Sequence, residues 1–234
     1  MFKVVLVETE GEENIGAIAR IMMNFSFREL ILVSPRCNHL SKNALNYAVH
    51  AKSILESAKI VKNISDVISD CELSIAFTKR IGQFRRKDLT SYNIGEFLKG
   101  YNNVALVFGN EKYGLKSEDI DMCDLICHIP SSEEFPSLNL SHSVGVICYE
   151  IYKSNVFSEK NDNLATKDEI NSVLDKTISF LHYLDYFKNT SDKRLKNYLS
   201  KLLHRIKPEK GDILILSNLI ERITGIVKRI SSKN

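Results

Sequence analysis

Short apolar runs alternate with segments of helical periodicity along the first two thirds of the chain. The runs consist mainly of Val, Ile, Leu and Phe, and they predict buried strands at five places: Lys3 to Glu8, Leu30 to Val33, Leu73 to Phe77, Val104 to Phe108 and Leu125 to Ile129. Between them, apolar residues recur at helical spacing in residues 15–25, 44–55, 64–68 and 95–98. This alternation predicts an α/β fold, a parallel sheet with helices on both faces.

The last third of the chain has helical periodicity alone. A long helix is expected from Leu140 to about Phe157, and then residues 158–166 lose the apolar periodicity and gather Asn, Asp, Ser and Lys, as a linker does. Beyond this segment, apolar residues repeat at helical spacing in residues 170–184, 195–203 and 213–230. We therefore expect a main domain in residues 1–157, a linker in 158–166 and a small all-α C-terminal extension in 167–234.

The composition is that of a globular protein. Hydrophobic residues make up 44% and charged residues 26% of the 234 residues, far from the values of a disordered chain. No uninterrupted apolar stretch approaches the roughly 18 residues that span a bilayer, and residues 1–13 end in acidic residues rather than forming a basic, apolar leader. We expect a cytoplasmic protein without a membrane segment.

The net charge of +3 is divided unevenly along the chain. Residues 1–157 carry 17 Lys and Arg against 19 Asp and Glu, whereas residues 158–234 carry 15 against 10. From Lys188 onward, 12 basic residues stand against 4 acidic ones. Charge alone supports a solvated helical face and a phosphate-binding face about equally.

The five cysteines are odd in number and sit mostly in apolar surroundings, which indicates reduced core thiols. A zinc site is the weaker interpretation of the group Cys123, Cys127, His128 and His142, because neighbouring residues of the expected strand point in opposite directions. We expect no metal.

Candidate chemistry lies where the expected strands end. The glycine fingerprints of dinucleotide-binding and P-loop proteins are absent. Asn14 stands where a helix cap is wanted, and Arg20 lies among apolar helical neighbours, where a charge needs a partner or a ligand. Gly109 follows a strand and suits either close ligand approach or a tight turn with Gly114.

A polar loop of residues 130–142 follows the fifth expected strand, and such loops commonly carry binding groups. Ser137 and His142 within it would suit a hydrolase, but the motif G-x-S-x-G is missing and no third partner is fixed. The hydrolase interpretation is therefore the weaker one.

Three segments together resemble the motifs of a known enzyme class. They are EGEENIGAIARIMMNF (residues 10–25), FGNEKYGL (108–115) and IPSSEEFPSLNLSHSV (129–144), and they occur in order. They resemble the motifs of SPOUT-class RNA methyltransferases of the TrmH/TrmJ branch. Residues 195–203, followed by HRIKPEK and an apolar helix, resemble the C-terminal extension of the TrmJ type.

The resemblance implies a trefoil knot at the carboxyl ends of the sheet, which holds S-adenosylmethionine. The residues that match the cofactor-binding positions are Leu106, Val107, Phe108, Gly109, Asn110, Glu111, Ile129, Pro130, Ser131, Ser137, Leu138 and Asn139. Those that match catalytic positions are Asn14, Arg20, Glu111, Ser137 and Asn139. The class forms homodimers, and the first-motif arginine reaches the active site of the partner subunit.

The implied reaction is attack of a ribose 2′-hydroxyl on the methyl group of a sulfonium. A hydroxyl is a poor nucleophile until its developing negative charge is stabilised. Because a guanidinium is very hard to deprotonate, we expect Arg20 to position phosphate and stabilise the alkoxide rather than act as a base. Asn14 and Glu111 would orient it, and Ser137 and Asn139 would shape the site.

Basic residues in two places are candidates for tRNA binding. The segment 79–87 offers five cations and one aromatic residue, although it also suits a solvated loop. The RNA-binding candidates are Lys79, Arg80, Arg85, Arg86 and Lys87 in this segment, with Lys201 and Arg205 in the extension.

Two departures from the bacterial pattern leave the nucleobase open. Ser26 replaces a common glycine, and the sequence Glu134-Phe-Pro-Ser137 replaces Glu-Tyr-Ser-Ser, as in archaeal TrmJ-type members. The expected function is tRNA ribose 2′-O-methylation at the first nucleotide of the anticodon loop (position 32), with cytidine favoured. The alternatives are a ribosomal RNA methyltransferase of the same class and a catalytically silent RNA-binding protein.

Overall fold

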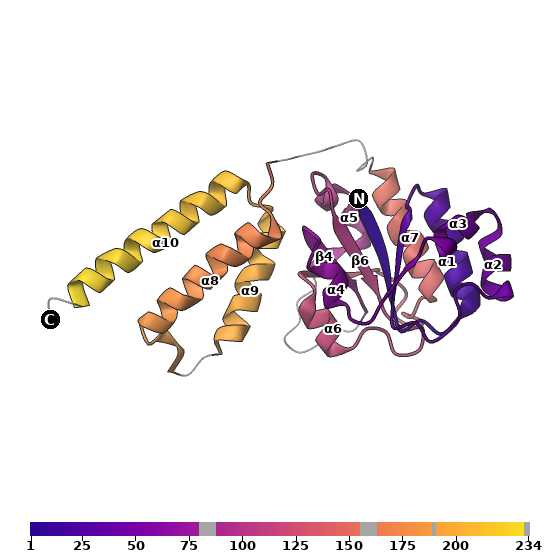
Figure 1. The fold of residues 1–234 in the computed structure, drawn as a ribbon, viewed down its shortest axis with the longest axis horizontal. Coiled ribbons are helices and arrows are strands. Elements are labelled where there is room, and N and C mark those ends of the chain that lie inside the picture. The colour runs from indigo at the N-terminus through magenta and orange to yellow at the C-terminus, as the bar shows by residue number, and fades with distance from the viewer. Residues whose placement is uncertain (80–87, 155–162, 189–190, 232–234) are drawn as a thin grey trace. The chain divides into compact units, whose positions relative to one another are not determined.

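The computed structural model describes residues 1–79, 88–154, 163–188 and 191–231 (Figure 1). It divides into two compact units, Met1–Asn161 and Asp162–Asn234. Within the described residues, no helix is long and apolar enough to cross a membrane.

The first unit is built on a seven-stranded, wholly parallel sheet with the order β3-β2-β1-β6-β4-β7-β5. Its strands are β1 (Phe2–Val7), β2 (Glu29–Val33), β3 (Lys59–Val61), β4 (Leu73–Phe77), β5 (Leu89–Thr90), β6 (Val104–Phe108) and β7 (Leu125–His128). Every residue of β1, β4 and β6 is buried, because helices cover both faces, and this explains why their sequences are apolar apart from Lys3 in β1 and Ser74 in β4.

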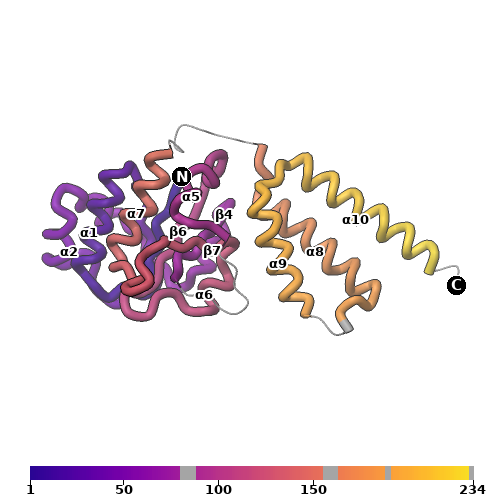
Figure 2. Tube along the Cα trace, turned by 180° about the vertical axis from the view of Figure 1, so that it is seen from behind, coloured from indigo at the N-terminus to yellow at the C-terminus, as the bar shows by residue number. Residues whose placement is uncertain are grey.

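Helices lie on both sides of this sheet (Figures 1 and 2). On one side α1 (Glu12–Asn24) packs against α2 (Lys42–Ala48) and α7 (Leu140–Lys153), and α7 packs against α5 (Ser91–Leu98). On the other side, Val67 of α4 (Ser65–Ile68) and Ile120 of α6 (Ser117–Met122) join a buried cluster with Val5, Val107 and Ile126 of the strands. The expected α/β class with helices on both faces is confirmed.

Two strands were missed by the sequence analysis, and one expected helix is broken. β3 and β5 are very short and form the two edges of the sheet, where β3 is largely exposed and therefore carries no apolar run. The helix expected over residues 44–55 is divided at Val49, whose positive φ of 54° cannot continue a helix. A 3₁₀ turn (Val49–Ala51) and α3 (Lys52–Glu56) follow.

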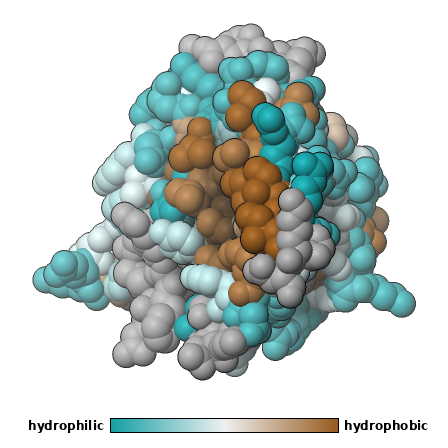
Figure 3. Space-filling model, turned by 90° about the vertical axis from the view of Figure 1, so that its left-hand side faces the viewer, coloured by the Kyte–Doolittle hydropathy of each residue, from teal (hydrophilic) through white to brown (hydrophobic). Residues whose placement is uncertain are grey.

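The second unit contains α8 (Lys167–Tyr183), α9 (Asp192–Ile206) and α10 (Lys210–Ser231), with a 3₁₀ turn at Tyr186–Lys188. Its core joins Ile170, Val173 and Leu174 of α8 to Ile213 of α10. Part of the segment expected as a linker belongs to this unit, since the Ala165 amide donates to the Pro208 carbonyl at 2.9 Å. Many apolar side chains remain on its surface (Figure 3).

Candidate active site

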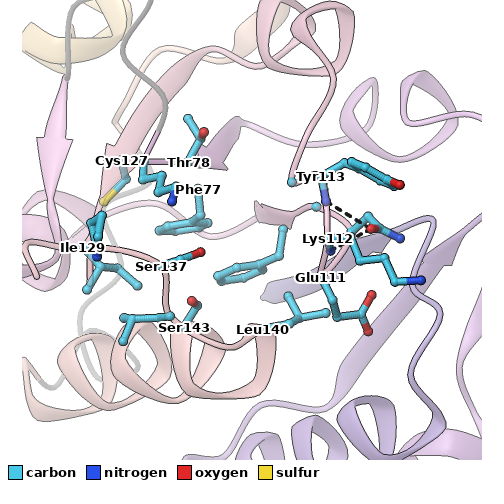
Figure 4. Close-up of a pocket in the computed structure, with 17 residues that line it drawn as sticks. Phe77, Thr78, Glu111, Lys112, Tyr113, Cys127, Ile129, Ser137, Leu140 and Ser143 are labelled. Atoms are coloured by element: carbon cyan, nitrogen blue, oxygen red, sulfur yellow. Dashed lines mark hydrogen bonds between the residues drawn. The ribbon is translucent and has the colours of Figure 1, made fainter. Parts of the chain in front are cut away.

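A pocket of about 240 Å³ opens where β4, β6 and β7 end (Figure 4). Parallel sheets place ligands at the carboxyl ends of their strands, and this pocket has that position. The rings of Phe77 and Phe108 stack in it with centroids 4.4 Å apart. Further apolar walls come from Ile129, Leu138 and Leu140.

Glu111 ties the loop after β6 to the start of α1. Its carboxylate accepts hydrogen bonds from the backbone amides of Glu10 and Gly11, each at 3.1 Å. It also accepts one from Asn14 Nδ2 at 3.1 Å. The N-terminal end of α1 favours this negative charge, because its first amides lack partners within the helix.

Asn14 and Asn139 continue the connection to a third segment. Asn14 Oδ1 accepts a hydrogen bond from Asn139 Nδ2 at 3.2 Å. The oxygen of the Asn139 side chain caps α7 by accepting from the Ser141 amide at 2.8 Å. A polar chain Glu111–Asn14–Asn139 therefore joins three segments, in which Asn14 is 97 residues from Glu111 and 125 residues from Asn139 along the sequence.

The expectation that Asn14 caps a helix is wrong. α1 begins one turn earlier, with Gly11 as its cap residue and no side-chain capping bond. Asn14 lies in the first turn, where its side-chain amide donates a hydrogen bond to Glu111 and accepts one from Asn139.

The backbone of the loop after β6 is fixed by Asn110 and two glycines. The buried Asn110 side chain donates to the Glu8 carbonyl at 2.7 Å and accepts from the Lys112 amide at 2.9 Å. A side chain at Gly109 would meet the Gly114 backbone at 2.2 Å, and Gly114 has a φ of +67°. The structure therefore favours the tight-turn interpretation of Gly109 over close approach of a ligand.

Exposed ion pairs surround this junction. Glu10 pairs with Lys112 at 2.7 Å, and Glu8 pairs with Lys116 and Arg36. The hydrogen bond from Lys116 lowers the pKa of Glu8, and that from Lys112 lowers the pKa of Glu10. These pairs hold the loops after β1, β2 and β6 together at the rim of the site.

Arg20 lies apart from this network within the single chain. It is exposed on α1, and it makes no hydrogen bond or ion pair among the described residues. It follows Asn14 by six residues and so lies about 9 Å further along the helix axis. The interpretation that Arg20 needs a partner inside the fold is not supported, because its side chain reaches solvent.

The expected cofactor residues divide into two groups. Those that line the pocket are Phe108, Gly109, Asn110, Glu111, Ile129, Ser137 and Leu138, whereas Leu106, Val107, Pro130, Ser131 and Asn139 do not. Leu106 and Val107 are fully buried inside β6. The other lining residues were not expected to bind the cofactor: Phe77, Thr78, Lys112, Tyr113, Gly114, Cys127, Pro136, Leu140 and Ser143. Lys79, expected to bind RNA, also lines the pocket.

Phe135 is an exposed aromatic residue in the loop that leads to the pocket. Its side chain is 79% exposed, next to Pro136 and Ser137, which line the pocket. A signal was present in the sequence, since a phenylalanine in an otherwise polar loop has no core to enter.

The structure argues against the zinc-site and hydrolase interpretations of the sequence. Cys123 packs in the cluster between the sheet and α6, whereas Cys127 lines the pocket, so these two thiols lie on opposite faces of the sheet. Burial raises the pKa of the Cys127 thiol. Among the described residues, no hydrogen bond joins Ser137 to His142.

Few of the expected RNA-binding residues can be placed. Arg80, Arg85, Arg86 and Lys87 lie outside the described residues. Lys79 is exposed at the pocket, and Lys201 and Arg205 are half-buried on α9. These last two belong to the second unit.

Comparison with known proteins decides the family. The model of the SpoU rRNA Methylase family matches residues 1–149. The chain belongs to the SpoU family. All three segments of the polar chain lie within the matched residues.

Relatives in the SpoU family include tRNA methyltransferases. The chain is 36% identical over 212 residues to the tRNA (cytidine-2′-O-)-methyltransferase TrmJ of Methanocaldococcus jannaschii, covering 88% of this chain and 90% of that one. The crystal structure of TrmJ from Z. mobilis ZM4 matches with a TM-score of 0.68 and 26% identity, covering 95% and 99% of the two chains.

A more distant SpoU methyltransferase, AviRb of Streptomyces viridochromogenes, was solved in complex with AdoMet. It matches with a TM-score of 0.55 and 17% identity over 68% of this chain and 61% of that one. At this identity the match supports the fold alone. The expected membership of the TrmH/TrmJ branch and the expected methyltransferase class are confirmed, and the SpoU family depends on S-adenosylmethionine.

Proposed function

We propose that this chain is an S-adenosylmethionine-dependent tRNA ribose 2′-O-methyltransferase that modifies the first nucleotide of the anticodon loop, preferentially cytidine. The polar chain Glu111–Asn14–Asn139 beside the pocket carries this proposal. The cytidine preference rests on the name of the Methanocaldococcus jannaschii relative. The enzyme would act in the cytoplasm, where tRNA is modified.

The pocket fits the proposed cofactor in its chemistry. Apolar side chains and the stacked phenyl rings provide a slot for an adenine. Backbone groups of the loops at residues 109–114 and 136–138 could form hydrogen bonds with the edge of the adenine. The hydroxyls of Thr78, Ser137 and Ser143 line the same space. When bound, S-adenosylmethionine supplies an activated methyl group.

The protein's own groups would manage the substrate hydroxyl. Arg20 would bind the neighbouring phosphate and stabilise the oxygen as its negative charge develops. Glu111 and Asn14 hold the start of α1, and Asn139 fixes the loop that carries Ser137. These residues therefore determine where ribose and cofactor can meet.

The isolated position of Arg20 supports a homodimer with shared sites. A single chain keeps this residue exposed and away from the pocket network. In the proposed dimer it would complete the site of the partner subunit. We further infer the trefoil knot of the class around residues 129–139, and RNA binding by the basic helical unit together with segment 79–87.

The decisive experiment follows labelled methyl transfer from S-adenosylmethionine to unmodified tRNA transcripts, with mapping of the modified nucleotide. We expect transfer at the first anticodon-loop nucleotide and loss of transfer in Arg20→Ala. Transfer to ribosomal RNA alone would replace the tRNA assignment, a relevant arm given the family's rRNA description. No transfer to either RNA would leave the silent RNA-binding alternative.

A further inference from the structure

The segment between β2 and β3 contains no acidic residue. Residues 30–55 carry three Lys or Arg and two His without a single Asp or Glu, whereas residues 1–157 as a whole carry more acidic than basic residues. One of the three cations, Arg36, is held by carboxylates at the rim of the pocket. The other two, Lys42 and Lys52, are exposed, and neither forms an ion pair among the described residues. The segment is therefore a positive patch on an otherwise slightly acidic unit.

The exposed side of α2 is polar and carries one aromatic ring. Ala44 and Ala48 are fully buried on the opposite side of the helix, whereas the side chain of Tyr47 is 51% exposed. Figures 1 and 2 show α2 at the outer edge of the first unit, beside α1. We call the exposed polar residues of α2 and the turns that follow it the α2 face; they are Lys42, Asn43, Asn46, Tyr47, His50 and Lys52.

Helices α1 and α2 lie side by side and run in the same direction. At their start, Asn43 Nδ2 donates a hydrogen bond to Glu13 Oε2 at 3.4 Å. One turn later the helices approach closely, because a side chain at Gly16 would meet the Tyr47 Cβ at 2.7 Å. Further along, α1 contacts the 3₁₀ turn Val49–Ala51 and then α3.

This alignment brings the α2 face to Arg20. Arg20 follows Gly16 by one turn, about 6 Å along the axis of α1, and it points to solvent. The segment of the neighbouring chain at that level runs from Tyr47 to His50. An exposed guanidinium, a tyrosine ring and an imidazole therefore share one side of the first unit.

The chemistry of the α2 face suits a nucleic-acid strand. Lysines bind phosphates, and an exposed aromatic ring among cations provides a surface on which an unpaired base can stack. The amides of Asn43 and Asn46 add hydrogen-bonding groups for sugar and phosphate. A lipid surface fits less well, because most of these side chains are strongly polar.

We propose that the α2 face binds the RNA strand next to the nucleotide that Arg20 holds, with an unpaired base stacked on Tyr47 and phosphates on Lys42 and Lys52. This inference rests on the proposed function, since it takes Arg20 to bind an RNA phosphate. In the proposed dimer Arg20 serves the partner's site, so the α2 face would hold RNA that is methylated in the other subunit.

Binding of an unmodified tRNA transcript to the full-length chain tests the role of the ring. The Kd is measured by filter binding without S-adenosylmethionine. We expect Tyr47→Leu to raise the Kd about fivefold or more, because stacking on the ring is lost. Tyr47→Phe keeps the ring and should bind as the wild type does. Circular dichroism verifies that both variants remain folded.

The salt dependence of the same binding tests the lysines. In Lys42→Met/Lys52→Met, the slope of log Kd against log salt should fall by about 0.7 to 0.9 for each lysine lost. Lys99→Met is the control and should leave the slope unchanged, because Lys99 ends α5, which α7 separates from α1.

Photo-crosslinking tests the contact without relying on affinity. A photoreactive residue replaces Asn46 on the α2 face in one protein, and Glu118 on α6, across the sheet, in the control. We expect products with the tRNA transcript from position 46, and no more from position 118 than in a sample kept in the dark.

Three results would overturn the inference. These are equal crosslinking from both positions, unchanged binding by Tyr47→Leu and the double lysine variant, and equally tight binding of poly-glutamate that the same variants lose. The last result would assign the face to acidic polypeptides. Binding through this face without methyl transfer would refute the proposed activity alone, whereas methyl transfer by a protein with none of these effects would refute the inference alone.

Discussion

Replacing Glu111 tests whether one carboxylate holds the candidate site together. In Glu111→Ala, the amides of Glu10 and Gly11 and the Asn14 side chain each lose an acceptor at 3.1 Å. A hydrogen bond of this kind contributes about 1 kcal/mol net, so the three together predict a loss of about 3 kcal/mol. For a unit of this size that corresponds to a fall in melting temperature of roughly 6 to 12 °C.

The same change should reduce methyl transfer beyond its effect on stability, because Asn14 would no longer be held against Asn139. Thermal melting followed by circular dichroism measures the first effect, and transfer to tRNA at 25 °C, where the variant is folded, measures the second. Glu118→Gln, which neutralises an exposed carboxylate of α6, is the control and should change neither. A Glu111→Ala protein with unaltered melting and activity would refute the role assigned to this carboxylate.

Three further predictions concern the dimer, the RNA and pH. Arg20→Ala and Asn139→Ala should each lower methyl transfer about a hundredfold or more when tested alone. When the two variants are mixed before the dimers assemble, about a quarter of wild-type transfer should return, because half the dimers then contain one intact site. No recovery would contradict shared sites. An exposed aromatic ring such as that of Phe135 suits stacking on an unpaired base, so Phe135→Leu should raise the KM for tRNA roughly fivefold or more, while Phe135→Tyr should not. Equal KM values for the two variants would count against stacking. Because the pKa of Glu8 is lowered from 4.5 by Lys116, its stabilising contribution is present above pH 4.5 and lost as pH falls through the lowered value. Denaturation midpoints between pH 3 and 7 should show that Lys116→Met reduces this acid sensitivity, and an unchanged slope would contradict it.

The sequence predicts the central strands well, because β1, β4 and β6 are buried on both faces and are therefore mostly apolar. The two edge strands of the sheet cannot be predicted in this way. β3 is largely exposed, and β5 has only two residues, so neither produces a recognisable run. The break at Val49 depends on a backbone conformation that valine does not signal.

The candidate site follows the same logic. Motif resemblance names Asn14, Glu111 and Asn139, but their mutual hydrogen bonds arise from contacts across about a hundred residues. Local reasoning gave Asn14 a capping role, because it could not place α1's first turn against the loop after β6. Pocket residues such as Phe77 and Leu140 look like ordinary core positions until the fold places them together.

Asn139 has a consequence for dynamics. Its side-chain oxygen starts α7, its side-chain nitrogen holds Asn14, and its carbonyl accepts from the Ser143 amide at 2.9 Å. Fraying of the first turn of α7 and release of the third motif from the first would therefore be one opening event. Hydrogen exchange at the Ser141 and Ser143 amides would therefore measure how often the unliganded site opens, because these amides are protected only while the first turn of α7 is formed.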